Sequence, residues 1–319
     1  MIVECRVAIK RFGPRVAAVL LVMLAVAGCA SVDPAPFEAF EAASGRVAEG
    51  SEAAFRLDEK WSREGFVERF VSGGGSYRDL LLVLDDPAAA PDSLSGLVAF
   101  RDAARAMDAL NRGFHDYATL LARLAGSELL TQREAERLEA DLNARVSGLA
   151  TRFTELGVEV PLELRSGSAL FTVAAVEGFR LFLDSRRRSA LRAALADNQA
   201  LVEGWCGVAR EALVRVGDDL RFEYRERTRG LAEGYAAAKT DTARRRLVGE
   251  ILSRNEALLD ALATLRALAA SYASLPAAHA NLEESLTRRG VSGADLERFT
   301  DRARELRILH ERLRREPKP

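Results

Sequence analysis

Cysteine and histidine are both scarce in this sequence, with three of each among 319 residues. So few cysteines argue against a scaffold held by disulfides, and so few histidines argue against a histidine-rich metal centre. No histidine has Asp or Glu three residues before it, so the Glu-x-x-His pairs of di-metal helical bundles are absent. We therefore expect no metal and no other cofactor.

An excess of one charge is also lacking, because 46 basic residues stand against 47 acidic ones. A chain near neutrality has no overall attraction to nucleic acid, and no nucleic-acid partner is expected. Gly-x-Ser-x-Gly, His-Glu-x-x-His and paired Cys-x-x-Cys motifs are missing. The glycine run Ser72–Ser76 lacks the Lys-Ser/Thr of a phosphate loop and is interpreted as a linker. We predict no catalytic residue, although carboxylate catalysis needs no local motif and an enzymatic activity stays open.

The first thirty residues have the order of a secretory signal. A basic leader with Arg6, Lys10, Arg11 and Arg15 precedes an uninterrupted apolar run, 16–27. That run is shorter than the roughly 20 residues of a membrane-spanning helix, and small residues follow it. The leader therefore predicts export.

The small residues end in Val26-Ala27-Gly28-Cys29, which resembles the lipobox of bacterial lipoproteins. The resemblance implies cleavage between Gly28 and Cys29 and a lipidated Cys29 thiol with palmitate among its acyl chains. Because Ala30 rather than Asp comes next, it also implies anchoring in the outer membrane, facing the periplasm or the cell surface. The alternative is an ordinary signal peptide or membrane anchor in which Cys29 is incidental.

The body is predicted to be all-α, an elongated multi-helix bundle with coiled-coil-like long helices. Apolar residues recur at alternating steps of three and four, as on one face of a helix. Examples are the series from Phe100 to Leu124, from Val202 to Val216 and from Val248 to Tyr272. We expect a signal peptide at 1–28, a lipidated tether at 29–36 and a helical body at 37–319, with an N-terminal subregion at 37–92 and a main bundle at 93–316.

Helix boundaries are predicted from turn residues. Asp85 to Ser95, which contains Pro87 and Pro91, is expected to be a loop. The stretch from Asp197 to Lys239 has no proline and would be about 65 Å long as one helix. Asp241 is the expected cap of the helix after it.

Four features were candidates for function. Cys206 is interpreted as a buried small apolar residue beside Trp205, with a reactive thiol as the alternative. The apolar stretch Ala169–Leu183 is interpreted as a buried helix, with a membrane-inserting head as the alternative. The runs Arg186–Arg188 and Arg244–Arg246 are expected to be solvated helix faces rather than lipid-binding patches. Asn255 interrupts an apolar seam and is expected to fix helix register.

These observations favour a lipid-anchored envelope protein that acts by binding, as a scaffold, spacer or assembly factor. Its partners would be the membrane, through the lipid, and an envelope protein; the oligomeric state is open, a homo-oligomer included. Two alternatives remain: a membrane-active or pore-forming bundle, and a bundle that binds a small ligand or catalyses a reaction.

Overall fold

The computed structural model describes residues 32–74, 92–126, 132–155, 158–165, 184–286 and 293–314, and all regular structure within these ranges is helical. The protein is thus an all-α multi-helix bundle, as the apolar periodicity predicts. The lipobox around Cys29 and the apolar stretch Ala169–Leu183 lie outside the described residues.

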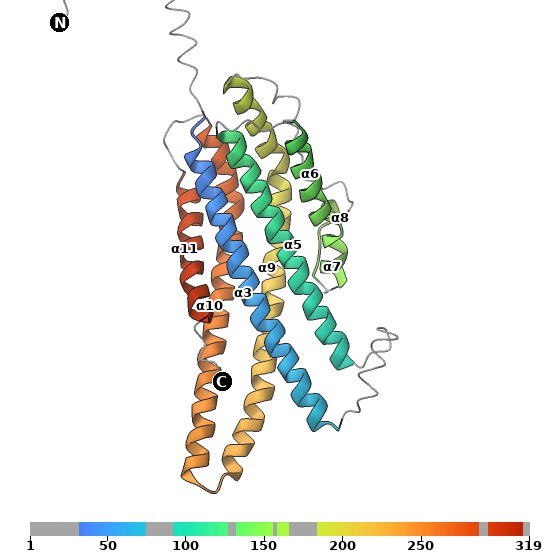
Figure 1. Ribbon diagram of the computed structural model, residues 1–319, viewed down its shortest axis with the longest axis vertical. Coiled ribbons are helices and arrows are strands. Elements are labelled where there is room, and N and C mark those ends of the chain that lie inside the picture. The colour runs from blue at the N-terminus through green and yellow to red at the C-terminus, as the bar shows by residue number, and fades with distance from the viewer. Residues whose placement is uncertain are drawn as a thin grey trace, which may run out of the picture.

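Five long helices form the body of the described structure (Figure 1). They are α3 (Ala35–Ser72), α5 (Asp92–Ala125), α9 (Asp184–Ala237), α10 (Asp241–Ser285) and α11 (Ala294–Arg314). Helices α9 and α10 form a long hairpin, while α3 packs against α5, α11, α10 and α9. The short helices α6 (Gln132–Val146), α7 (Leu149–Glu155) and α8 (Leu162–Arg165) lie along one flank beside α5 and α9. Helix α3 therefore reaches every long helix of the body.

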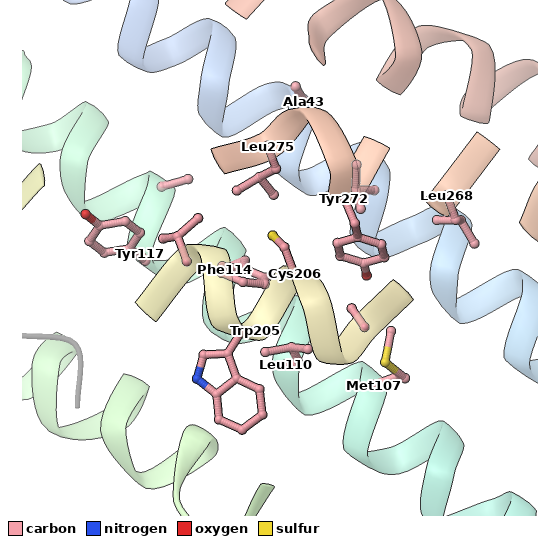
Figure 2. Packing of buried hydrophobic residues seen from close by; sticks show 14 of the residues in the cluster. Ala43, Met107, Leu110, Phe114, Tyr117, Trp205, Cys206, Leu268, Tyr272 and Leu275 are labelled. Atoms are coloured by element: carbon pink, nitrogen blue, oxygen red, sulfur yellow. The ribbon is translucent and has the colours of Figure 1, made fainter. Parts of the chain in front are cut away.

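One hydrophobic core joins these helices, and Figure 2 shows its centre. The predicted series are buried there from Met107 to Leu124 on α5 and from Val202 to Val216 on α9, with Tyr117 and Trp205 each only 1% exposed. Burial of each large side chain contributes about 1.5 to 3 kcal/mol. Residues of α3 such as Phe37 and Phe40 belong to the same cluster, so α3 folds with the main bundle.

The predicted long helix before residue 239 is a single helix in the structure. Helix α9 has 54 residues, which corresponds to about 81 Å. The predicted cap of the next helix was wrong by one position, because Thr240 is the N-cap of α10 and its hydroxyl accepts a hydrogen bond from the Ala243 amide at 3.2 Å. The carboxylate of Asp241 instead lies in the first turn, where its negative charge interacts favourably with the positive end of the helix dipole.

The loop predicted from Asp85 to Ser95 ends too late. Helix α5 already begins at Asp92, so the last four residues of the predicted loop, up to Ser95, are helical. At the end of α3, Gly74 has a φ of 70°, a left-handed conformation that suits glycine and stops the helix. The predicted break after Ser72 is therefore confirmed at its first residues.

The far end of the α9–α10 hairpin projects beyond the other long helices (Figure 1). There the predicted seam from Val248 to Tyr272 is only partly buried: Val248 is 41% exposed, whereas Tyr272 is fully buried. Two helices alone cannot cover an apolar face that several helices cover further up. Helix α10 is also long and apolar enough to cross a membrane, with half of its most apolar window buried in the bundle.

The chain enters the body at the opposite end from the hairpin turn at 238–240 (Figure 1). Val32 and Pro36 are already buried there, and α3 begins at Ala35. The last part of the predicted tether at 29–36 thus packs on the body.

Candidate functional site

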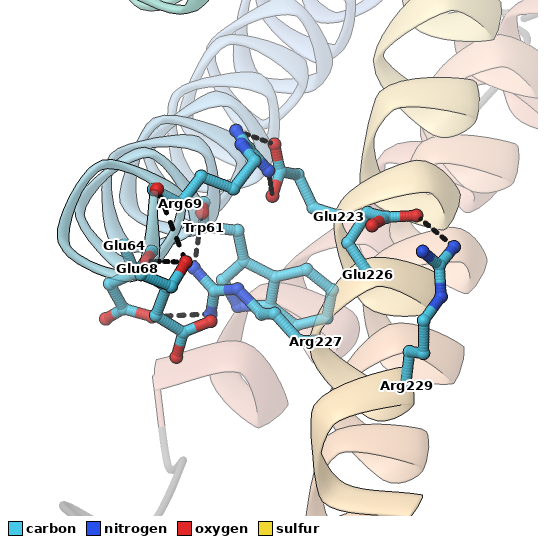
Figure 3. Close-up of polar contacts among 9 residues, drawn as sticks. Trp61, Glu64, Glu68, Arg69, Glu223, Glu226, Arg227 and Arg229 are labelled. Carbon is cyan, nitrogen blue, oxygen red and sulfur yellow. Dashed lines mark hydrogen bonds and ion pairs between the residues drawn. The ribbon is translucent and has the colours of Figure 1, made fainter. Parts of the chain in front are cut away.

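A cluster of charged side chains lies where α3 meets α9 (Figure 3). The Arg69 guanidinium donates two hydrogen bonds to the Glu223 carboxylate, both of 2.9 Å. The Glu223 side chain is 5% exposed and that of Arg69 is 40% exposed. A bidentate pair of this kind fixes both the distance and the rotation of the two helices.

A second arginine strengthens the same contact. Arg227 of α9 donates to the Glu64 carboxylate at 2.7 Å and to the backbone carbonyl of Trp61, both on α3. Its side chain is 8% exposed, so the pair with Glu64 is largely shielded from water on the arginine side. Together, Arg69 and Arg227 join α3 to α9 in two successive turns.

Gly65 permits the close approach of the Glu223 carboxylate. A Cβ atom at this position would overlap the Oε2 and Cδ atoms of Glu223 and would lie 3.1 Å from the Arg69 guanidinium. Any larger residue would therefore push the ion pair apart.

Two further carboxyl groups lie beside this ion pair. Asp58 of α3 is 2% exposed, and its Oδ1 atom has no hydrogen-bond partner. Burial, and then the charges of Asp219 and Glu223, raise the pKa of Asp58 well above its usual range. Burial also raises the pKa of Asp219 to about 6, with the nearby Asp218 and Glu223 adding to the effect. The cluster therefore retains protons that exposed carboxylates would lose.

A second polar group lies deeper in the core, towards the end where α3 begins. The Tyr117 hydroxyl and His279 Nε2 are 2.9 Å apart, and His279 Nδ1 and Gln199 Oε1 are 2.6 Å apart. Since the glutamine oxygen can only accept, His279 carries its proton on Nδ1 and accepts from Tyr117 on Nε2. Burial lowers the pKa of His279 to about 4, so the ring is neutral at pH 7.

Two tyrosine–asparagine pairs form further polar contacts between helices. Tyr272 donates to Asn111, which joins α10 to α5, and Tyr224 donates to Asn255, which joins α9 to α10. The role predicted for Asn255 is consistent with this contact, because a half-buried amide that bonds one tyrosine disfavours other registers of the hairpin.

The remaining candidate residues do not assemble into a reactive site. Cys206 is 2% exposed, and its burial raises the pKa of its thiol, which keeps it protonated. The interpretation as a buried apolar residue is confirmed. His115 contacts α3 near Gly45, His279 lies in the core and His310 lies on α11. Within the described ranges no three His, Cys, Asp or Glu side chains could hold a metal ion.

The second arginine run lies at the free end of the hairpin. Arg244, Arg245 and Arg246 are all exposed, and the Arg244 guanidinium lies 5.9 Å from the centre of the Tyr235 ring. The predicted solvated face is confirmed for this run. For the first run, the side chains of Arg186 and Arg187 lie outside the described residues.

A groove of about 520 Å³ lies between α3 and α11, at the end where the chain enters the body. Its lining includes Asp33, Pro36, Leu296 and Asp301, and the Arg304 guanidinium is bonded to Asp301 at 2.6 Å. It is open to solvent, and the Thr300 hydroxyl in its lining donates to the Leu296 carbonyl of its own helix at 2.9 Å.

Sequence reasoning missed the carboxyl cluster of α3 and α9. A signal for it exists: Ser44, Ser51, Asp58 and Gly65 follow one another at seven-residue intervals, and all four are buried. Small or polar residues repeated at heptad spacing mark a helix face that packs closely against other helices. No family model, curated protein or solved structure shows a significant match to the chain.

Proposed function

We propose that the protein is a lipid-anchored component of a bacterial cell envelope that acts by binding, as a scaffold, spacer or assembly factor without catalytic activity. The lipid would be carried by Cys29 after cleavage behind Gly28. The observation that carries the proposal is the ordered leader, with its basic residues, short apolar run and lipobox, ahead of a long helical body.

The length of the body supports a spacer role. Helix α10 has 45 residues, about 68 Å, and runs from the hairpin turn back to the end where the chain enters the body. A lipid attached at Cys29 would therefore place the exposed tip, with Tyr235 and Arg244, far from the membrane surface. Several acyl chains on one cysteine anchor a protein stably.

The state of the polar groups supports binding rather than catalysis. Tyr117 and His279 form the one tyrosine–histidine pair of the described core, and at 1% and 0% exposure neither can reach a substrate. The contact between α3 and α9 contains Asp58, Asp219 and Glu223, and their charges affect how firmly these two helices pack. Buried groups of this kind fix how helices pair.

The anchor is tested by replacing Cys29 with Ser in the native cell and following the protein through membrane fractionation and mass spectrometry. We expect the native chain in the membrane fraction with an acylated N-terminal cysteine, and the variant in the soluble fraction or uncleaved. Cys206→Ser is the matched control and should stay acylated and membrane-bound. An unmodified Cys29 thiol on the membrane-bound native chain would refute the anchor.

The binding role is tested with a photo-crosslinking residue in place of Phe222, which is 50% exposed on the hairpin. We expect one discrete envelope protein to be captured in living cells, and the capture to be lost in the Cys29→Ser strain. Leakage of dye from liposomes exposed to the purified protein would instead support membrane activity and overturn the proposal.

A further inference from the structure

The outer side of the α9–α10 hairpin carries one continuous exposed face. On α9 its residues recur every three or four positions from Ala193 to Ala232, and on α10 they recur from Arg245 to Glu284. We call this surface the hairpin face. A groove of about 150 Å³ joins the two rows at Val214, Gly217, Leu262 and Leu265.

The apolar residues of this face are distributed unevenly. On the free half of α10, Leu252 and Leu259 are 54% and 63% exposed. On the other half of α10, the same row presents alanines, of which Ala273 and Ala277 are exposed and Ala270 is half-buried. Val214, at the groove between the two halves, is 62% exposed. The half near the hairpin turn thus has large, protruding apolar side chains, and the half near the chain entrance has small ones.

The charges of the face are divided in the same way. Glu203 and Glu284 lie on the half near the chain entrance, and Arg225 and Arg245 lie on the half near the hairpin turn. All four side chains are exposed. Closer to the groove the signs are mixed, with Arg210 and Arg266 on the first half and Asp218 and Glu256 on the second. Away from the groove, the half with small apolar residues is acidic and the half with large ones is basic.

From this arrangement we propose that the hairpin face binds a second copy of the chain, antiparallel, with α9 on α9 and α10 on α10. The two-fold axis crosses the groove at Val214. Tyr224 lies ten residues after Val214, and its partner Asn255 lies ten residues before Leu265, so Val214 and Leu265 are at the same height on the hairpin. The axis therefore meets both helices at the groove.

This axis places opposite charges against each other on α9. Glu203 lies eleven residues before Val214 and Arg225 lies eleven after it, so each faces the other across the interface. Arg210 and Asp218, four residues before and four after Val214, form a second such pair. Each pair occurs twice, as two-fold symmetry requires.

On α10 the same axis, centred between Thr264 and Leu265, matches large residues with small ones. Leu252 faces Ala277 of the second copy and Leu259 faces its Ala270, so each protruding side chain meets an alanine. Alternating large and small residues across a helix interface allows close packing. At the ends of the face, Arg245 meets Glu284 of the second copy.

A parallel pairing lacks this complementarity. It would lay α9 of one copy on α10 of the other, so that Leu252 and Leu259 would face the α9 row with Arg221 and Arg225 instead of alanines. The antiparallel pairing brings only the two Arg266 side chains, on the rim of the groove, close to their own copies. The match of large and small residues therefore selects the antiparallel arrangement, and the charge pairs on α9 agree with it.

The face is large enough for a stable dimer. Its length along α9 corresponds to about 60 Å and two packed helices are about 18 Å wide, which gives about 1,000 Å² on each copy. A standard interface buries about 800 Å² per partner. The two chain entrances then lie at opposite ends of the dimer.

Disulfide trapping at the axis tests the arrangement. The full chain, purified in mild detergent with its native cysteines replaced by Ser, receives Val214→Cys, since only a residue on the axis can pair with itself. Oxidation by copper phenanthroline should convert more than half of the chain to a disulfide-linked dimer. Val71→Cys, at an α3 position that is 72% exposed and off the face, is the control and should stay monomeric. Equal yields from the two variants would overturn the proposal.

The register is tested by charge reversal, read by sedimentation equilibrium. Glu203→Arg should weaken dimerisation about tenfold, since two exposed pairs become repulsive. The double variant with Arg225→Glu should restore the affinity, whereas Glu49→Arg on the exposed side of α3 should leave it unchanged. Failure of the double variant to restore the dimer would refute this register. Because these chains carry no Cys29, the result is independent of the lipid anchor proposed above.

Discussion

Removal of the Arg69 guanidinium tests most directly what holds α3 on α9. Arg69→Met keeps most of the side-chain volume and removes both hydrogen bonds to Glu223. Glu223 then stays 5% exposed, next to Asp58 and Asp219, without its main counter-charge. The arrangement changes from a paired cluster into three crowded carboxyl groups.

The size of the effect follows from burial. Breaking a fully buried ion pair costs about 3 to 5 kcal/mol, and exposed pairs contribute about 1 kcal/mol or less. Because the Arg69 side chain is 40% exposed, we expect a loss of about 2 to 3 kcal/mol in the free energy of unfolding at pH 8. For a chain of this length, that loss lowers the Tm by about 5 °C.

The pH dependence identifies the cause. Burial and crowded charge already raise the pKa of Asp58 and of Asp219. Loss of the Arg69 charge raises both further, so the folded variant binds protons that the unfolded chain releases. The stability lost at pH 8 should therefore return as the pH falls towards 5. Urea unfolding of the variant and the native protein at pH 8 and pH 5, followed by circular dichroism, measures the difference.

The control is Arg56→Met on the same helix. Arg56 also pairs with a glutamate, Glu52, but its side chain is 75% exposed, and its loss should cost less than 0.5 kcal/mol at either pH. A loss for Arg69→Met that is the same at pH 8 and pH 5, or no greater than that of the control, would refute the reasoning.

Two further predictions concern the same helix contacts. The pKa of Asp219, near 6 in the fold, means that this group favours the folded state at low pH and that its contribution is lost as the pH rises from about 4 through 6. Asp219→Asn should thus stabilise the protein by about 1 kcal/mol at pH 8, after discounting for solvent, and by nothing at pH 3.5; a gain that is equal at both pH values would contradict the assignment. In the core, Trp205→Ala should cost about 3 to 5 kcal/mol, because the indole is 1% exposed and packs against Phe153. The control is Phe222→Ala, at a 50% exposed ring of the same helix, which should change the free energy of unfolding by less than 0.5 kcal/mol. Equal losses for the two variants in thermal unfolding would contradict the burial of Trp205 and the exposure of Phe222.

The sequence by itself determined that the body is helical and which face of most helices is buried. Apolar spacing is a local property, so Leu110, Tyr117 and Trp205 could be placed in the core without knowledge of their neighbours. The same reasoning failed for Val248 at the free end of the hairpin. Its spacing is that of a core residue, but burial depends on how many helices surround it.

Only the tertiary structure brought Asp58, Asp219 and Glu223 together with Arg69. The residues on α3 and those on α9 are at least 150 positions apart in the chain, and nothing in their local sequence shows which charges will face each other. Their pKa values depend on burial and on distance, which exist only after α3 has packed on α9. Helix formation is thus decided by neighbours along the chain. Which charges pair is decided by how the helices pack in three dimensions, and the local sequence does not show that packing.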